Sequence, residues 1–94
     1  MAKGLVISPD AYLDIDRIIE FNNNRNKSDT YSKRFIKELY EKFNQLIQSP
    51  FIGIKTSRAS VLLLIWNSFY MFYKVTDNSI NILSIYHQKE NINL

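Results

Sequence analysis

The fold is decided by residues 61–75, VLLLIWNSFYMFYKV, which form the least polar stretch of the chain. About a dozen of these positions are apolar, whereas a helix needs ~20 apolar residues to cross a bilayer. Asn67 and Ser68 interrupt the stretch with two polar residues that are typical of a tight turn. The stretch therefore predicts two β-strands joined by a hairpin, and not a membrane span.

Upstream of this hairpin, the sequence predicts a short strand at the amino terminus and then a helix. The triplet Ser8-Pro9-Asp10 is typical of a helix start: Ser8 can accept a hydrogen bond from a free N–H group, Pro9 suits the first turn, and Asp10 favours the positive end of the helix dipole. Apolar residues then recur with helical spacing over residues 11–19. We expect the polar run over residues 22–27 to end this helix.

A second, longer helix is predicted to start at Ser28 or Asp29 and to end before Pro50. Large apolar side chains recur along it as a stripe, namely Tyr31, Phe35, Leu39, Phe43 and Leu46. After Gly53 the pattern changes to β-branched and aromatic runs, which turn residues divide at 67–68 and 77–79. The expected order is β-α-α-β-β-β in one α+β domain over residues 1–94, with a two-helix hairpin packed on one face of an antiparallel sheet.

The composition excludes several kinds of site. The chain has 94 residues, no cysteine and one histidine, so we expect no disulfide, no metal site and no cofactor. The first ten residues have no apolar run of signal-peptide length, which favours the cytoplasm. The net charge of +3 is mildly basic and leaves a polyanion partner open.

Both strands of the hairpin are apolar on both faces. In the second strand, Phe69, Met71 and Tyr73 share one face, whereas Tyr70 and Phe72 lie on the other. Two helices can cover only one face of the sheet. An uncovered apolar face is typical of a partner-binding surface. The alternative is that the sheet curls and covers this face with its own side chains.

The order and spacing of these elements resemble the RelE/ParE toxins of bacterial type II toxin–antitoxin systems, which are also called plasmid stabilisation proteins. The resemblance rests on Ala11 and Ile15 and on residues 46–53 (LIQSPFIG), 69–75 (FYMFYKV) and 82–89 (ILSIYHQK). It implies a growth-inhibiting toxin that a cognate antitoxin wraps and holds inactive. RelE-like members cut messenger RNA in the ribosome, and ParE-like members poison DNA gyrase.

The resemblance also implies roles for individual residues. His87 and Lys89 would be the catalytic residues of a metal-independent endoribonuclease, a reaction that needs proton transfer and cations around the phosphate. Three cations would bind the target or another polyanion, namely Lys55, Arg58 and Lys74. Three aromatic residues of the sheet would bind the antitoxin, namely Tyr70, Phe72 and Tyr86.

Three departures favour the ParE-like branch. Where RelE-like nucleases have a Tyr-Arg pair at the start of the third strand, this chain has Phe69-Tyr70 and lacks that phosphate-binding arginine. Glu90 is an acid where positive charge is common, and the chain ends at Leu94 without an aromatic tail. Gyrase inhibition is therefore the expected activity. A ribonuclease and a degenerate toxin that only binds antitoxin stay open.

Each of these residues also has a structural explanation. His87 could be an ordinary residue at a strand end, and Lys55 and Arg58 could belong to a solvated loop. Tyr70 and Tyr86 could stack on bases or simply pack against neighbours. The basic residues of the second helix form either a solvated face or an electrostatic surface for the antitoxin; they are Lys33, Arg34 and Lys37. Trp66 is expected in the core.

Overall fold

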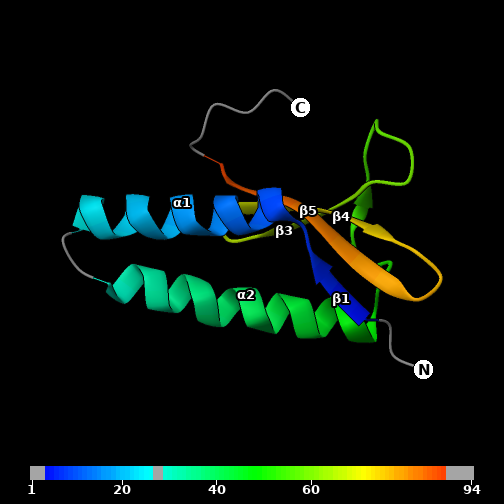
Figure 1. Ribbon diagram of the computed structural model, residues 1–94, viewed down its shortest axis with the longest axis horizontal. Coiled ribbons are helices and arrows are strands. Elements are labelled where there is room, and N and C mark those ends of the chain that lie inside the picture. Colours follow the sequence, from blue (N-terminus) through cyan, green and yellow to red (C-terminus); the bar gives the residue numbers. More distant parts are fainter. Residues whose placement is uncertain (1–3, 27–28, 89–94) are drawn as a thin grey trace.

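The computed structural model describes residues 4–26 and 29–88. Two antiparallel helices, α1 (Pro9–Asn26) and α2 (Thr30–Gln48), lie side by side against a sheet (Figure 1). The five strands of the sheet lie in the order β1 (Gly4–Ile7), β5 (Ser79–His87), β4 (Phe69–Val75), β3 (Leu62–Trp66) and β2 (Ile54–Lys55). The α+β class and the helix hairpin on the sheet confirm the prediction.

The sheet differs from the prediction in two details. It has a fifth strand, β2, which is only two residues long and therefore too short to show a period of two in the sequence. The sheet is also mixed, because β1 runs parallel to β5 while all other pairs are antiparallel. The chain reaches β5 only after both helices and three strands, so the first and last strands become neighbours.

Helix α1 starts as predicted but ends later. The Ala11 N–H donates to Ser8 Oγ at 3.1 Å, which caps the first turn. The expected end at residue 22 is wrong, because the helix continues to Asn26. Asn23 accepts a hydrogen bond from Ser32 Oγ of α2 at 2.6 Å. The polar run therefore contributes to the contact between the helices instead of breaking the first one.

The core lies between the helices and one face of the sheet. Helix α2 contributes four large side chains that are at most 3% exposed, namely Phe35, Leu39, Phe43 and Leu46. Strand β4 alternates as predicted, with Phe69, Met71 and Tyr73 in the same core. Trp66 is 6% exposed and belongs to this cluster, which confirms its expected place. Among the described residues, no helix is long and apolar enough to span a membrane.

A β-bulge in β5 changes which side chains face the core. The pairing with β4 skips Leu83, since Ile82 and Ser84 pair with consecutive residues of β4. The buried positions consequently shift from Ile82 to Ile85, three residues further on. Tyr86 then lies on the opposite face of the sheet from Ile85.

Candidate functional site

The sheet face opposite the described helices carries the three aromatic residues expected to bind an antitoxin. Tyr70 lies directly opposite Tyr86 in the β4–β5 register. The rings of Phe72 and Tyr86 meet edge to face, with their centroids 6.1 Å apart. Phe72 is only 9% exposed, so side chains of the sheet cover part of this face themselves. The structure therefore brings the three residues together but leaves mainly the two tyrosines accessible.

The exposed apolar side chains of this face lie toward its β2 edge. Ile65 is paired with Tyr70, and Ile54 is paired with Leu63, so these side chains share the face. Ile54 is 57% exposed and Ile65 is 51% exposed. We call this surface the helix-free face; it consists of Ile54, Leu63, Ile65, Tyr70, Phe72 and Tyr86.

A polar clasp from α1 holds β5 beside Tyr86. Asp14 Oδ2 accepts the Ile85 N–H at 2.9 Å, and Arg17 Nη2 donates to the Ile85 carbonyl at 3.2 Å. Arg17 Nη1 also pairs with Asp14 Oδ1 at 2.6 Å, and its guanidinium lies 5.6 Å from the centroid of the Tyr86 ring. Strand β1 pairs with β5 only as far as Ile7, which lies opposite Ile82. Beyond that point, Asp14 and Arg17 hydrogen-bond the β5 backbone in place of a neighbouring strand.

Sequence reasoning did not find this clasp. It assigned no role to Asp14. The sequence signal for a buried carboxylate was the position of Asp14. It lies three residues after Ala11 and four before Ile18, on the buried side of α1. A carboxylate at such a position needs hydrogen-bond donors, and Asp14 is 7% exposed.

The cations expected to bind a polyanion lie at the β2 end of the sheet. Lys55 and Arg58 line one open pocket of about 530 Å³, formed by the β2–β3 connection together with Phe51, Leu62 and Val75. Within the described part of the chain, neither cation has an ion-pair partner. Lys74 follows Tyr73 on β4 and is exposed, but it does not line this pocket.

Tyr73 fixes the chain segment that leads into this basic pocket. Its hydroxyl donates to the Pro50 carbonyl at 2.9 Å and accepts from the Gly53 N–H at 2.9 Å. A Cβ atom at Gly53 would lie 2.5 Å from that hydroxyl, so the close approach requires glycine. Burial raises the pKa of the Tyr73 hydroxyl, and the hydrogen bond from Gly53 opposes part of that rise.

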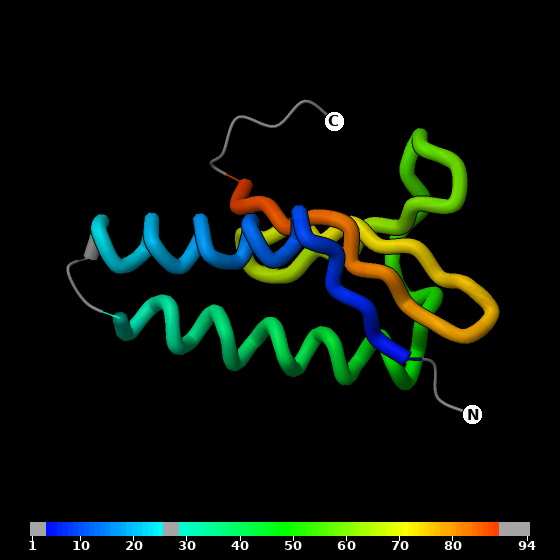
Figure 2. Tube along the Cα trace, in the orientation of Figure 1, coloured from blue at the N-terminus to red at the C-terminus, as the bar shows by residue number. Residues whose placement is uncertain are grey.

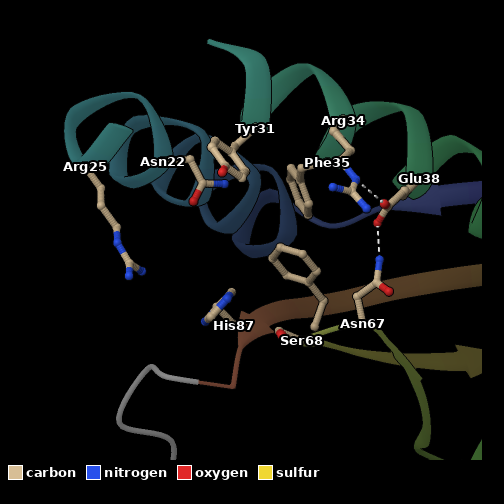
Figure 3. Close-up of a pocket in the computed structure, with 10 residues that line it drawn as sticks. Asn22, Arg25, Tyr31, Arg34, Phe35, Glu38, Asn67, Ser68 and His87 are labelled. Carbon is tan, nitrogen blue, oxygen red and sulfur yellow. Dashed lines mark hydrogen bonds and ion pairs between the residues drawn. The ribbon is translucent and has the colours of Figure 1, made fainter. Parts of the chain in front are cut away.

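His87 lies in a different pocket, at the opposite end of β4. Its ring meets the edge of Phe69 with centroids 5.1 Å apart, and it lines an open pocket of about 370 Å³ between the helices and the β3–β4 turn (Figure 3). Lys89, its expected catalytic partner, falls outside the described residues.

The distance between the two pockets follows from the length of β4. Phe69 pairs with His87, whereas Val75 lines the basic pocket, six residues further along the same strand. At ~3.4 Å per residue this is about 20 Å. Figure 2 shows the end of β5, in orange-red, and the β2–β3 connection, in light green, at opposite ends of the sheet. The structure thus does not bring His87 together with Lys55 and Arg58.

Other cations, which sequence reasoning did not connect with His87, lie in its pocket. Arg25 comes from the last turn of α1 and Arg34 from the beginning of α2, and both line the pocket. Arg34 Nε donates to Glu38 Oε1 at 3.2 Å, and Glu38 Oε2 accepts from Asn67 Nδ2 at 2.5 Å. Arg34 had been treated as part of a basic stripe on the helix surface. No spacing along the chain could show that α1, α2 and β5 meet here.

No metal centre is formed by the described residues. Within residues 4–26 and 29–88, no three histidine, cysteine, aspartate or glutamate side chains lie close enough together to hold a metal ion. The candidate sites are therefore three: the helix-free face, the basic pocket at Lys55 and Arg58, and the pocket at His87.

Comparisons with known proteins give the fold and the family. Similar solved structures include the following two. One is the chromosomal ParDE TA system from P. aeruginosa, at 19% identity and a TM-score of 0.77, covering 92% of this chain and 96% of that chain. The other is the toxin–antitoxin complex RelBE2 from Mycobacterium tuberculosis, at 15% identity and a TM-score of 0.71, covering 93% of this chain and 99% of that chain.

Sequence comparison gives a more specific result than these distant structures. No curated protein matched the chain. The family model described as "ParE toxin of type II toxin-antitoxin system, parDE" matches residues 5–92, nearly the whole chain. This match agrees with the resemblance to RelE/ParE toxins and with its preference for the ParE branch. The chain belongs to the ParE toxin family of type II toxin–antitoxin systems.

Proposed function

We propose that this protein inhibits growth in the cytoplasm by binding and poisoning DNA gyrase, and that a cognate antitoxin neutralises it. The ParE family membership supports the gyrase target, since ParE-like toxins are the gyrase-directed branch of the wider family. The observation that carries the choice is that His87 and the two cations Lys55 and Arg58 lie in different pockets, at opposite ends of a β4 span of about 20 Å. Gyrase poisoning needs a binding surface rather than an assembled acid–base site.

In this proposal, the basic pocket faces the target. Its lining contains Lys55, Arg58 and hydroxyl groups of the β2–β3 connection. It contains no carboxylate, so the pocket suits an anionic group. Lys74 adds a third cation at the same end of the sheet.

A supercoiling assay tests the gyrase target. The purified protein should block supercoiling by gyrase from its native host and raise the yield of cleaved plasmid. Lys55→Ala combined with Arg58→Ala should weaken both effects, whereas Lys37→Ala on α2 should not. Normal supercoiling at a large molar excess of folded protein would refute the gyrase target.

The second candidate is a RelE-type endoribonuclease with His87 and Lys89 as its catalytic residues. We expect no messenger RNA cleavage, because Tyr70 stands where RelE-like nucleases have a phosphate-binding arginine, and Lys55 and Arg58 lie at the far end of the sheet from His87. Primer extension on abundant transcripts after induction would show any cuts. Translation-dependent cuts that disappear in a His87→Ala variant would favour the nuclease over the gyrase inhibitor. If expression does not inhibit growth at all, the remaining candidate is a degenerate toxin that only binds antitoxin.

The antitoxin is proposed to cover the helix-free face. Two of the solved structures similar to this chain are of toxin–antitoxin systems, which supports a protein partner. Ile54 and Ile65 are more than half exposed on that face, beside the accessible Tyr70 and Tyr86. Burying apolar area stabilises a complex by about 25 cal/mol per Å², so a few hundred Å² contribute several kcal/mol before ordering costs.

Hydrogen exchange would locate the antitoxin. With the antitoxin bound, amides along residues 70–76 should exchange more slowly. Without the antitoxin, the protein should self-associate, and co-expression should make it more soluble. A monodisperse monomer whose residues 70–76 show unchanged protection in the complex would contradict this surface. In that case, the cover that Phe72 already receives from the sheet would be sufficient.

A further inference from the structure

The pocket at His87 is not used in the gyrase proposal, and its lining has a distinct chemistry. Its volume of about 370 Å³ lies near the lower end of the ~300–1,000 Å³ range of small-molecule sites. Two guanidinium groups, one carboxylate, three aromatic rings, two amides, two hydroxyls and one imidazole line it. Such a lining can recognise both charge and a flat ring.

The two arginines keep the pocket positive. Arg25 makes no ion pair with any described residue, so its guanidinium is available to a ligand. Arg34 is oriented by Glu38 through Nε, and both Glu38 oxygens are already engaged, by Arg34 and by Asn67. Figure 3 shows Arg25 extending on the side of His87, while Arg34 lies across the pocket, turned toward Glu38.

The aromatic rings give the pocket flat apolar walls. Phe35 and Phe69 pack together with centroids 4.7 Å apart, and the His87 ring abuts Phe69. Tyr31 lines the pocket and is 54% exposed, so its side chain is accessible to a ligand. A planar ring can stack on such a side chain, which contributes to the binding of nucleotide bases.

We propose that this pocket binds a phosphate group carried on a planar ring, which is the chemistry of a nucleotide. Arg25 contacts the phosphate, because a guanidinium donates two parallel hydrogen bonds to phosphate oxygens. The base stacks on Tyr31, which lines the pocket and is more than half exposed. A bare anion would leave the aromatic walls unused, and an uncharged ring would leave Arg25 without a partner.

This inference does not depend on gyrase being the target. Trp66, the single tryptophan, reports on the pocket because its ring lies 5.5 Å from Phe69, which lines it. We expect AMP to quench or shift Trp66 fluorescence saturably and to move the amide NMR signals of Asn67 and His87. AMP should bind at least about tenfold more tightly than adenosine or inorganic phosphate, because only AMP uses both parts of the pocket.

Variants of the two arginines test the geometry. Arg25→Ala should weaken AMP binding about tenfold or more, and Arg25→Lys should restore only part of it, since lysine lacks the guanidinium fork. Lys37→Ala is the matched control, because it removes a cation of α2 that does not line the pocket, and it should leave binding unchanged. Both arginines are exposed, so the variants should fold.

Two results would overturn the inference. One is an absence of saturable AMP binding, and the other is AMP binding that Arg25→Ala and Arg34→Ala leave unchanged. A 5′-phosphorylated single-stranded oligonucleotide distinguishes the sources of the ligand. Binding about tenfold tighter than AMP would identify nucleic acid as the source, and equal binding would identify the free nucleotide.

Discussion

The two faces of the sheet bury their side chains by different means. On the covered face, Met71, Ile82 and Ile85 are completely buried beneath the helices. On the helix-free face, Phe72 is 9% exposed because neighbouring side chains such as Tyr86 pack against it, and Ile65 remains 51% exposed. The chain therefore completes one face by itself and leaves the other partly open. Stability should depend on the first face, and partner binding on the second.

The largest expected effect contrasts matched isoleucine truncations on the two faces. Ile82→Ala should lower the free energy of unfolding by about 2–5 kcal/mol, because it leaves a cavity in the core. Ile65→Ala should change it by at most about 0.5 kcal/mol, because Ile65 is already half exposed. Urea unfolding followed by circular dichroism measures both. Equal losses would mean that the helix-free face also carries the fold.

The next effect concerns the edge where the two faces meet. Asp14→Ala should cost about 1–3 kcal/mol, because it leaves the buried Ile85 N–H without its acceptor. Asp16→Ala, on the exposed side of the same helix, is the control and should have little effect. If both variants unfold at the same urea concentration, the clasp contributes nothing to stability.

A smaller effect is expected from the one buried hydroxyl of β4 on the covered face. Tyr73→Phe should cost about 1–2 kcal/mol, since Pro50 and Gly53 lose their partner. The control is Tyr12→Phe, because Tyr12 is 57% exposed.

The same residue predicts a pH dependence. Burial raises the Tyr73 pKa above its ordinary value of 10.0, so the folded state resists ionisation while the unfolded state does not. Its stabilising contribution is complete below pH 10 and falls as the pH rises above 10 toward the folded-state pKa. Thermal unfolding from pH 8 to 11 should show a shallower alkaline loss in Tyr73→Phe. An identical loss in both proteins would exclude Tyr73 as its source.

The last substitution, at Ile65, should have the smallest effect on stability and a large effect on antitoxin binding. Ile65→Lys should change the free energy of unfolding by at most about 0.5 kcal/mol, because the new charge is placed in water. It should weaken antitoxin binding by about tenfold or more, because the same charge would be buried in the complex. Co-purification and titration with the antitoxin measure this. If Ile65→Lys binds the antitoxin with wild-type affinity, the antitoxin does not cover the helix-free face.

Features that depend on neighbouring residues could be predicted from the sequence. The helix start at Ser8 and the alternation of Phe69, Met71 and Tyr73 follow from local hydrogen bonding and from the period of a strand. The extension of α1 past Asn22 could not be predicted, because Asn23 is satisfied by Ser32 of the other helix.

The candidate sites were less predictable than the fold. Tyr70 and Phe72 were placed on one face from the period of the strand, but the bulge that skips Leu83 and adds Tyr86 to this face has no sequence signal of its own. The meeting of His87 with Arg25 and Arg34 depends on how three elements pack, which the distance along the chain does not encode. The sequence consequently suggested Lys55, Arg58 and Lys74 as target-binding cations, and it did not connect Arg25 or Arg34 with His87.

The clasp on Ile85 also has a consequence for the order of folding. Asp14 and Ile85 are 71 residues apart, and Ser8 reaches Leu83 across 75 residues, so these hydrogen bonds close very long loops. Local contacts of the helix hairpin form rapidly, whereas contacts with such sequence separation form slowly. On the ribosome, β1 and α1 must wait for the last strand to leave the exit tunnel before their polar groups find partners. The surface beside Tyr86 is thus assembled only after β5 has left the ribosome.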